Sequence, residues 1–170
     1  MFKSESILGY VILFLVIVII IKNYYDNDFF QLKCIVSDVK GKKYSVRERE
    51  NMKPACDLLA NTTEKLITIV EHLADKYPEQ DNVKRLVKNF NPKKIKEILP
   101  TSEYTAYSEN KGEKIAFCLS SVDKDDVNHL IDQNTLMFVA LHELSHVATK
   151  SIGHNQEFWS NFKFLLEEAS

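Results

Sequence analysis

The sequence predicts an α+β fold that is mainly helical, with a small sheet, preceded by an N-terminal transmembrane helix. Residues 7–21 form an apolar run that contains no charged side chain. Apolar residues recur at helical spacing over 51–77 and 134–148, and apolar residues alternate with small ones over 114–120. With 170 residues, 45% of them hydrophobic, the chain is long enough for one globular domain and a short extension.

The apolar run is expected to anchor the chain in a membrane. As a helix, residues 7–21 would span about 22 Å, and Tyr24 and Tyr25 follow where interfacial aromatic residues are common. A cleaved signal peptide would need a small-residue cleavage site, and a buried core helix would need a polar face; the sequence offers neither. We therefore expect residues 1–25 to be a transmembrane anchor and residues 26–170 to be the globular domain.

Charge and cysteine content limit the partners and the compartment. The net charge of −2 and the isoelectric point of about 6.2 give no general attraction to nucleic acid, so a nucleic-acid partner is not expected. The three cysteines are widely spaced and include no C-x-x-C pair, which favours free thiols in a reducing compartment. More lysines follow the apolar run than precede it, which favours the globular domain on the cytoplasmic side of a single-pass membrane protein.

The globular part is expected to begin with a hairpin and a long helix. Residues 32–36 and 44–46 are strand-like and flank the turn sequence at 38–41, which ends in glycine. Helical spacing of apolar residues then runs over 51–77, and Pro54 is tolerated because it falls in the first turn. This helix is expected to cover one side of the sheet.

Two short helices and a second pair of strands are expected next. The helices cover 81–90 and 91–99, and the second of them starts with Asn-Pro, a typical helix beginning. Strands are expected at 103–107 and 114–120, because a turn sequence at 110–112 lies between them. A final helix is expected to follow the histidine-rich segment described below and to pack against it.

The most informative segment is the predicted helix 134–148, which contains the sequence H-E-L-S-H at 142–146. Residues four apart lie on one face of a helix, so His142 and His146 can direct two imidazoles at one point, as two metal ligands do. Glu143 lies about 100° round the helix, where it can reach a metal-bound water without being a ligand.

A third ligand is expected shortly after this helix. Gly153 lets the chain turn back so that His154 can supply another nitrogen, and Glu157 is the competing candidate. The alternative is a core helix with two incidental histidines, but such polar groups are unfavourable to bury without a partner. The apolar residues of the helix that are expected to be buried are Phe138, Leu141, Leu144, Val147 and Ala148.

The segment HELSHVATKSIGHNQEFW, at residues 142–159, resembles the active-site segment of the WLM and SprT-like zinc metallopeptidases. Those families pair an H-E-x-x-H helix with a later histidine that an aromatic residue soon follows. The chain is also similar to small, membrane-anchored metallopeptidase-like proteins of large DNA viruses. The resemblance covers residues 134–166, and it departs from both families in the seven residues that separate His146 from His154.

The resemblance implies a zincin-like fold and a peptidase that hydrolyses peptide bonds of a protein or peptide substrate. It implies a Zn²⁺ cofactor held by His142, His146 and His154, with Glu143 as the general base. It also implies that a strand before the active-site helix forms the edge of the cleft, to which a substrate backbone can add as a further strand. Residues 114–120 are the expected edge strand.

A second function remains open. A membrane-tethered structural or adaptor protein, such as a virion component, would use the same zinc only to stabilise its fold. Glu143 favours the enzyme, because a structural zinc site does not need that carboxylate. DNA–protein crosslink repair, which the resembled families include, is not expected because of the predicted anchor and the acidic isoelectric point. Tyr104 and Tyr107 are the candidate transition-state donors, although both are more typical of packing residues.

Overall fold

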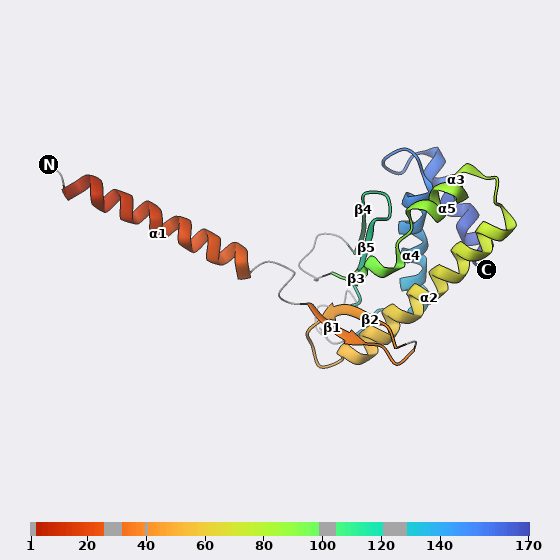
Figure 1. Cartoon of the computed structure of the whole chain (residues 1–170), viewed down its shortest axis with the longest axis horizontal. Coiled ribbons are helices and arrows are strands. Elements are labelled where there is room, and N and C mark those ends of the chain that lie inside the picture. The colour runs from red at the N-terminus through yellow and green to blue at the C-terminus, as the bar shows by residue number, and fades with distance from the viewer. Residues whose placement is uncertain (1–2, 26–31, 40, 99–104, 121–128) are drawn as a thin grey trace. The chain divides into compact units, whose positions relative to one another are not determined.

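The chain divides into two compact units, Met1–Gln31 and Leu32–Ser170 (Figure 1). The computed structural model describes the backbone of residues 3–25, 32–39, 41–98, 105–120 and 129–170, and the side chains of the same residues except 3–8 and 23–25.

The first unit contains one helix, α1 (Lys3–Tyr25), whose described side chains are mostly apolar and exposed. In the part of the chain that the structure describes, no helix is long and apolar enough to cross a membrane. The prediction of a transmembrane helix at the N-terminus is therefore not confirmed by the described residues.

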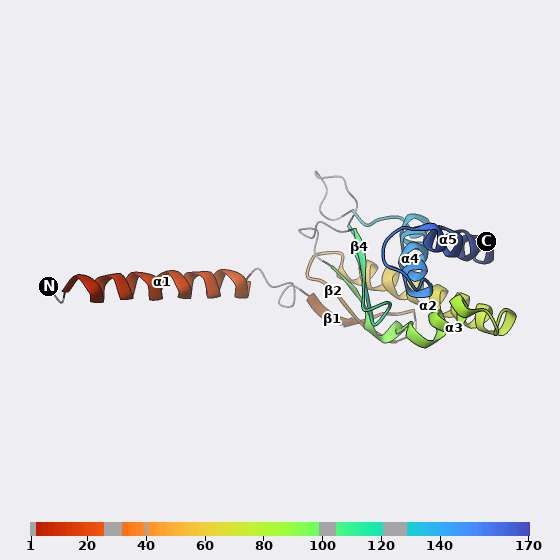
Figure 2. The same cartoon turned by 90° about the horizontal axis from the view of Figure 1, so that it is seen from above.

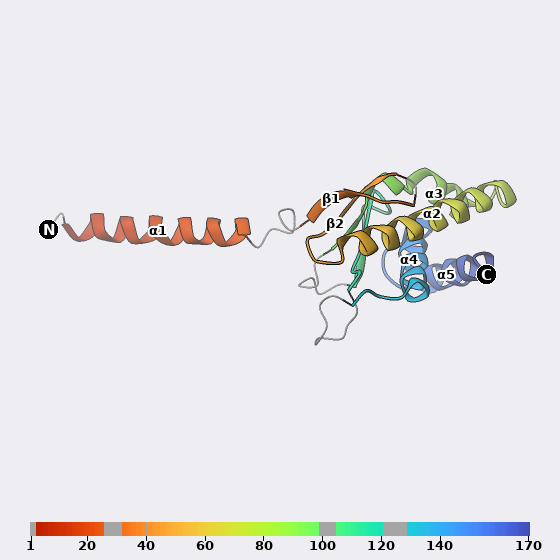
Figure 3. The same ribbon diagram turned by 90° about the horizontal axis from the view of Figure 1, so that it is seen from below.

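The globular unit begins with the predicted hairpin and the predicted long helix. Strands β1 (Leu32–Val36) and β2 (Lys43–Arg47) pair antiparallel, and Gly41 in the turn has a φ of 65°. Helix α2 (Met52–Lys76) follows and packs against β2 through its buried apolar face (Figure 3). These elements agree with the prediction because each depends on local turn chemistry and apolar spacing.

A second sheet has three strands in the order β3-β5-β4. Strand β3 (Ile95–Glu97) runs parallel to β5 (Lys114–Phe117), and β4 (Ala106–Glu109) runs antiparallel to β5. The turn between β4 and β5 forms as predicted at 110–112. The predicted start of the first of these strands, residues 103–104, lies outside the described residues.

The prediction of a helix over residues 91–99 is wrong. Asn91 does start a helical turn, and its side chain accepts a hydrogen bond from the backbone N–H of Lys93. The turn is only the short 3₁₀ helix η2 (Pro92–Lys94), because Ile95 and Glu97 are buried and their backbone pairs with β5.

The prediction that residues 114–120 form an edge strand is wrong for the same reason. Because β3 covers one side of β5, β5 is the central strand and β4 lies at the edge of the sheet. The strand that lines the cleft opposite α4 is therefore β4, not β5.

Three further helices complete the globular unit: α3 (Asp81–Asn89), α4 (Gln133–Ala148) and α5 (Gln156–Glu168). Helix α4 packs against α2, α3 and α5 and borders β4 and β5, so it runs through the middle of the domain (Figure 2). Four of the five residues predicted to be buried are buried, whereas Phe138 is 53% exposed. Leu136 and Ala140 are buried as well, although they were not predicted to be. The mixed helical fold with a small sheet thus agrees with the prediction.

Candidate metal centre

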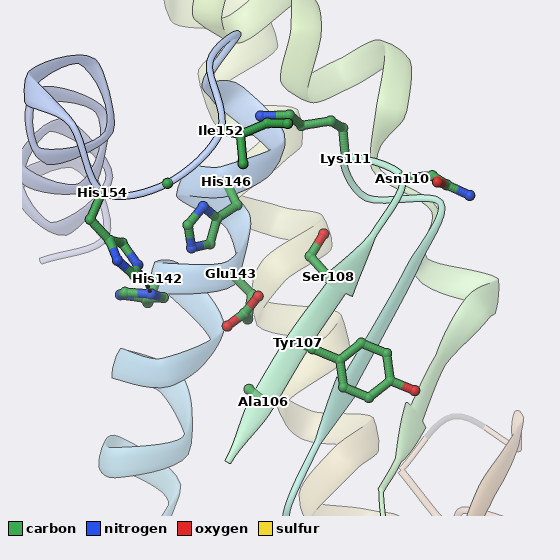
Figure 4. Close-up of a pocket in the computed structure, with 11 residues that line it drawn as sticks. Ala106, Tyr107, Ser108, Asn110, Lys111, His142, Glu143, His146, Ile152 and His154 are labelled. Carbon is green, nitrogen blue, oxygen red and sulfur yellow. Dashed lines mark hydrogen bonds between the residues drawn. The ribbon is translucent and has the colours of Figure 1, made fainter. Parts of the chain in front are cut away.

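Three histidines from two neighbouring segments converge at the middle of α4 (Figure 4). Helix α4 starts at a strong cap, since the Asp132 carboxylate accepts hydrogen bonds from the next helical N–H groups. His142 and His146 lie one turn apart on the same side of this helix, and His154 reaches them from the segment before α5. One ring nitrogen from each histidine lies within 4.8 Å of the other two, so the cluster could hold a metal ion.

Burial keeps two of these imidazoles in the form that binds metals. The nitrogens Nε2 of His142 and His154 are 3.0 Å apart. Burial, followed by the neighbouring histidines, lowers the pKa of His146 to about 4, and burial also lowers the pKa of His142. Since an imidazole must be neutral to coordinate a metal, both rings are available as ligands at neutral pH.

Glu143 is next to this cluster without joining it. Its side chain projects from α4 toward β4, away from His154, as Figure 4 shows. The residue is only 6% exposed, and burial raises the pKa of its carboxyl group to about 7. Among the described residues none forms an ion pair or hydrogen bond with it, so its carboxylate is free to act on a group in the cleft.

The cleft beside the histidines has a volume of about 650 Å³ and lies between α4 and β4. Ser108 lies on β4 across the cleft from α4, whereas the Tyr107 ring points away from the histidines (Figure 4). The Ser108 hydroxyl is buried and has no hydrogen-bond partner among the described residues. Tyr104, the other candidate donor, lies outside the described residues.

Phe158 of α5 forms the aromatic support of the cluster. Its ring centroid lies 4.9 Å from that of His142, 4.4 Å from that of His146 and 4.6 Å from that of His154, and its side chain is fully buried. The helix begins at Asn155, whose side chain accepts a hydrogen bond from the Phe158 N–H. Periodicity predicts Phe158 to be a core residue; its contact with all three imidazoles depends on where the chain turns back before α5.

Comparison with known proteins identifies the fold. The chain resembles Wss1 from Saccharomyces cerevisiae, with a TM-score of 0.52 and 19% identity over 71% of this chain and 80% of that one. A mutant of the same protein matches with a TM-score of 0.55 and 18% identity, over 73% and 84% of the two chains. The fold is WLM-like. At this level of identity the likeness concerns the fold alone.

Sequence relatives of the chain come from large DNA viruses. An uncharacterized protein of Acanthamoeba polyphaga mimivirus is 29% identical over 138 residues, which cover 78% of this chain and 68% of the relative. An uncharacterized protein of Invertebrate iridescent virus 6 is 40% identical over 65 residues, which cover 38% and 35% of the two chains. No family model matches the sequence. These relatives fit a viral origin for the chain.

Glu157, the competing third ligand, is not part of the histidine cluster in this WLM-like fold. Its carboxylate accepts hydrogen bonds from Lys150 and Ser151, and it forms an ion pair with Arg85 at 3.1 Å. The structure therefore brings His142, Glu143, His146 and His154 together and engages Glu157 elsewhere. The sequence does not predict that Arg85 pairs with Glu157 or that Lys111 lines the cleft. A lysine or arginine on a helix or in a turn carries no local signal of a partner that is distant in sequence.

Proposed function

We propose that the globular unit is a zinc-dependent metallopeptidase of the H-E-x-x-H type. The observation that carries this proposal is the joint arrangement of the three histidines and Glu143 at one cleft. A structural zinc site is closed by four protein ligands, whereas a catalytic site keeps one position open. Among the described residues, the cluster offers three ligands and one unpaired carboxylate beside them, which is the donor set of a catalytic site.

The ligand geometry fits one zinc ion. Nitrogens that bind a tetrahedral zinc ion at about 2.0–2.1 Å lie a little over 3 Å apart. His142 and His154 show a nitrogen separation of 3.0 Å, and a ring nitrogen of His146 lies within 4.8 Å of both. In this proposal these three residues hold the ion, which when bound acidifies its water to a pKa of about 7 and polarises the substrate carbonyl.

Glu143 performs the proton transfers in the proposed reaction. Its carboxylate accepts a proton from the attacking water and delivers it to the amine that leaves when the peptide bond breaks. In the zinc-free site burial raises its pKa to about 7, so burial makes the carboxylate a better proton acceptor than an exposed one.

The substrate in this proposal is an extended protein or peptide segment that adds to β4. The backbone of β4 pairs with β5 on one side only, and among the described residues no strand covers the other side. A peptide that pairs with residues 106–109 would lie across the cleft above Glu143.

Metal content and proteolysis together test the function. We expect full-length protein to contain one zinc ion, to cleave a denatured protein substrate, and to lose both properties in the presence of a chelator. X-ray absorption should give three nitrogen ligands and one oxygen ligand. Zinc with four protein ligands, together with no cleavage across a broad panel of substrates, would favour a structural or adaptor protein instead.

We also propose that residues 7–21 attach the chain to a membrane, with the globular unit on the cytoplasmic side. The support is the sequence: this run is apolar and uncharged, and lysines are more frequent after it. Full-length protein should stay with membranes during alkaline carbonate extraction, and a chain that lacks residues 1–28 should not. Release of both would refute the attachment.

A further inference from the structure

The third histidine of the cluster depends on a loop and not on a helix. His154 lies in residues 149–155, which join α4 to α5 and are called the His154 loop below. His154 is exposed, and Ile152 in the same loop is 91% exposed. The His154 ring contacts Phe158 and Trp159 of α5, but the loop buries little apolar side chain of its own, so its backbone depends on polar contacts.

Glu157, in the first turn of α5, holds the first half of the His154 loop. Its Oε1 atom accepts a hydrogen bond from the backbone N–H of Lys150 at 3.0 Å. Its Oε2 atom accepts from the backbone N–H and from the hydroxyl of Ser151, at 3.3 and 2.8 Å. The Lys150 N–H, as the largest of these influences, lowers the pKa of Glu157, so the carboxylate is charged at neutral pH.

Arg85 of α3 connects Glu157 to the end of α4. Its Nε atom donates a hydrogen bond to the backbone carbonyl of Ala148 at 2.8 Å, and its Nη2 atom donates to Oε1 of Glu157 at 3.1 Å. The planar guanidinium holds these two acceptors at a fixed separation, which a flexible lysine ammonium would not do. Arg85 thus fixes the place where α4 ends relative to the place where α5 begins.

Lys111 reaches the same loop from the opposite wall of the cleft. Its ammonium donates hydrogen bonds to the backbone carbonyl of Thr149 at 3.0 Å and to that of Ser151. Figure 4 shows the side chain running from the turn after β4 toward Ile152. The turn itself packs against α4, because Gly112 lies against the side chain of Val147.

We propose that Arg85, Lys111 and Glu157 form a loop clamp that positions His154 to bind the metal. The three side chains come from α3, from the β4–β5 turn and from α5, and all of them hold backbone atoms of residues 148–151. They are positioning residues, since none belongs to the histidine cluster. This inference rests on the proposed zinc site.

Loss of the clamp should weaken metal binding through His154 alone. His142 and His146 would keep their positions, because α4 is held by the core. His154 would sample more positions, and ordering the loop on zinc binding would cost conformational entropy that reduces the affinity. Residues that orient metal ligands from outside the ligand set typically affect metal affinity about 10–100-fold, and we expect about tenfold for Glu157→Ala and for Arg85→Ala.

The zinc dissociation constant of full-length protein, measured by competition with a chromogenic chelator, is the direct readout. Glu157→Gln should lose less affinity than Glu157→Ala, because one amide oxygen can still accept from both Lys150 and Arg85. Two variants serve as matched controls. Lys84→Ala removes a cation next to Arg85 that pairs with exposed Glu79, and Glu167→Ala removes a carboxylate from α5 that pairs with Lys163.

A double-mutant cycle separates positioning from general destabilisation. In a His154→Ala background the clamp has no ligand left to position, so adding Glu157→Ala should change the zinc affinity less than about twofold. A merely structural role would lower the melting temperature of the zinc-free protein and would weaken zinc binding equally in both backgrounds.

The outcomes are distinct for the clamp and for the proposed function. A tenfold loss in the parent background that disappears in the His154→Ala background supports the clamp. Equal losses in both backgrounds, or no loss in either, overturn it while leaving the zinc site in place. Failure of the parent chain to bind zinc would overturn the site itself and the clamp with it.

Discussion

Helix α4 and the His154 loop deliver ligands to one cluster by different physical means. His142 and His146 are fixed by the helical repeat and by a core that surrounds α4, in which Leu144 and Val147 are fully buried. His154 is exposed and lies on a loop whose backbone is held by side chains from other elements. The first arrangement can be read from local sequence, and the second depends on contacts 40 and 72 residues away along the chain.

Replacement of Glu143 on α4 should have the largest effect on peptidase activity. Glu143→Gln keeps the size of the side chain but cannot accept a proton at neutral pH. Peptidase activity should fall by about two orders of magnitude or more, while zinc content stays that of the parent. Cleavage of a denatured protein and zinc stoichiometry are measured on the same preparation. Undiminished cleavage would remove Glu143 from the mechanism.

Deletion of one ligand from each region tests the contrast itself. His146→Ala should weaken zinc binding more than His154→Ala does, because the helical ligand is already in place and the loop ligand must remain ordered. Both losses should exceed the about 10–100-fold that is typical of residues outside the ligand set. The zinc dissociation constants of the two variants provide the measurement. The opposite ranking would show that the loop is as well ordered as the helix.

The sequence predicts most of the helices and the approach of the three histidines, because both depend on local periodicity and turn chemistry. It fails at residues 95–97, where a strong helix start is overridden by tertiary structure. Glu97 is fully buried there, forms a 2.8 Å ion pair with Arg49 and accepts the backbone N–H of Arg47 at 2.8 Å. These partners lie about fifty residues earlier, so the local pattern does not contain them.

Errors about the site follow from that one misassigned segment. The resemblance implies an edge strand before the active-site helix, and residues 114–120 were expected to be that strand; β3, which was not predicted, makes β5 central and leaves β4 at the edge. The exposure of Phe138 has a different origin, since helical spacing predicts which residues share a face but not how far α5 covers that face. The loop clamp could not be predicted either, because its residues are polar and give no periodic pattern. Arg85 and Lys111 also lie far in sequence from the backbone atoms that they hold.

A glycine between the two regions gives a stability effect of intermediate size. Gly112 has a φ of 101°, and a Cβ atom there would lie 2.7 Å from both methyl groups of Val147. Gly112→Ala should therefore destabilise the protein by about 2–4 kcal/mol, from backbone strain and overpacking together. Gly41 is the matched control, with a φ of 65° and no atom within 4 Å of the added Cβ. Gly41→Ala should lose only about 1 kcal/mol.

Chemical unfolding gives the free energy of unfolding of both variants. Gly41→Ala reports backbone strain alone, and Gly112→Ala reports strain together with crowding against Val147. Equal destabilisation would mean that the turn can move away from α4, and Lys111 would then move with it. In that case the zinc affinity of Gly112→Ala should also fall.

The pH dependence of the zinc-free protein is the smallest expected effect and separates the buried groups of α4 from one another. Burial lowers the pKa of His146 to about 4 and also lowers that of His142. Below the ordinary histidine value of about 6.5, the unfolded chain therefore binds protons that the folded chain does not. This contribution makes stability fall as the pH drops from about 6.5 toward 4.

Glu143 changes the pH dependence of the free energy of unfolding in the opposite direction to the histidines. Burial raises its pKa to about 7, so between its ordinary value and pH 7 the folded chain holds a proton that the unfolded chain has released. That contribution to stability is lost as the pH rises through 7, and it offsets the histidine effect in the range where both act. The Glu143→Gln variant lacks this titrating group and therefore lacks its contribution to stability. The urea midpoint of the zinc-free variant should thus fall more steeply than that of the parent between pH 6.5 and about 4.5, and parallel curves would show that Glu143 is charged in the folded site.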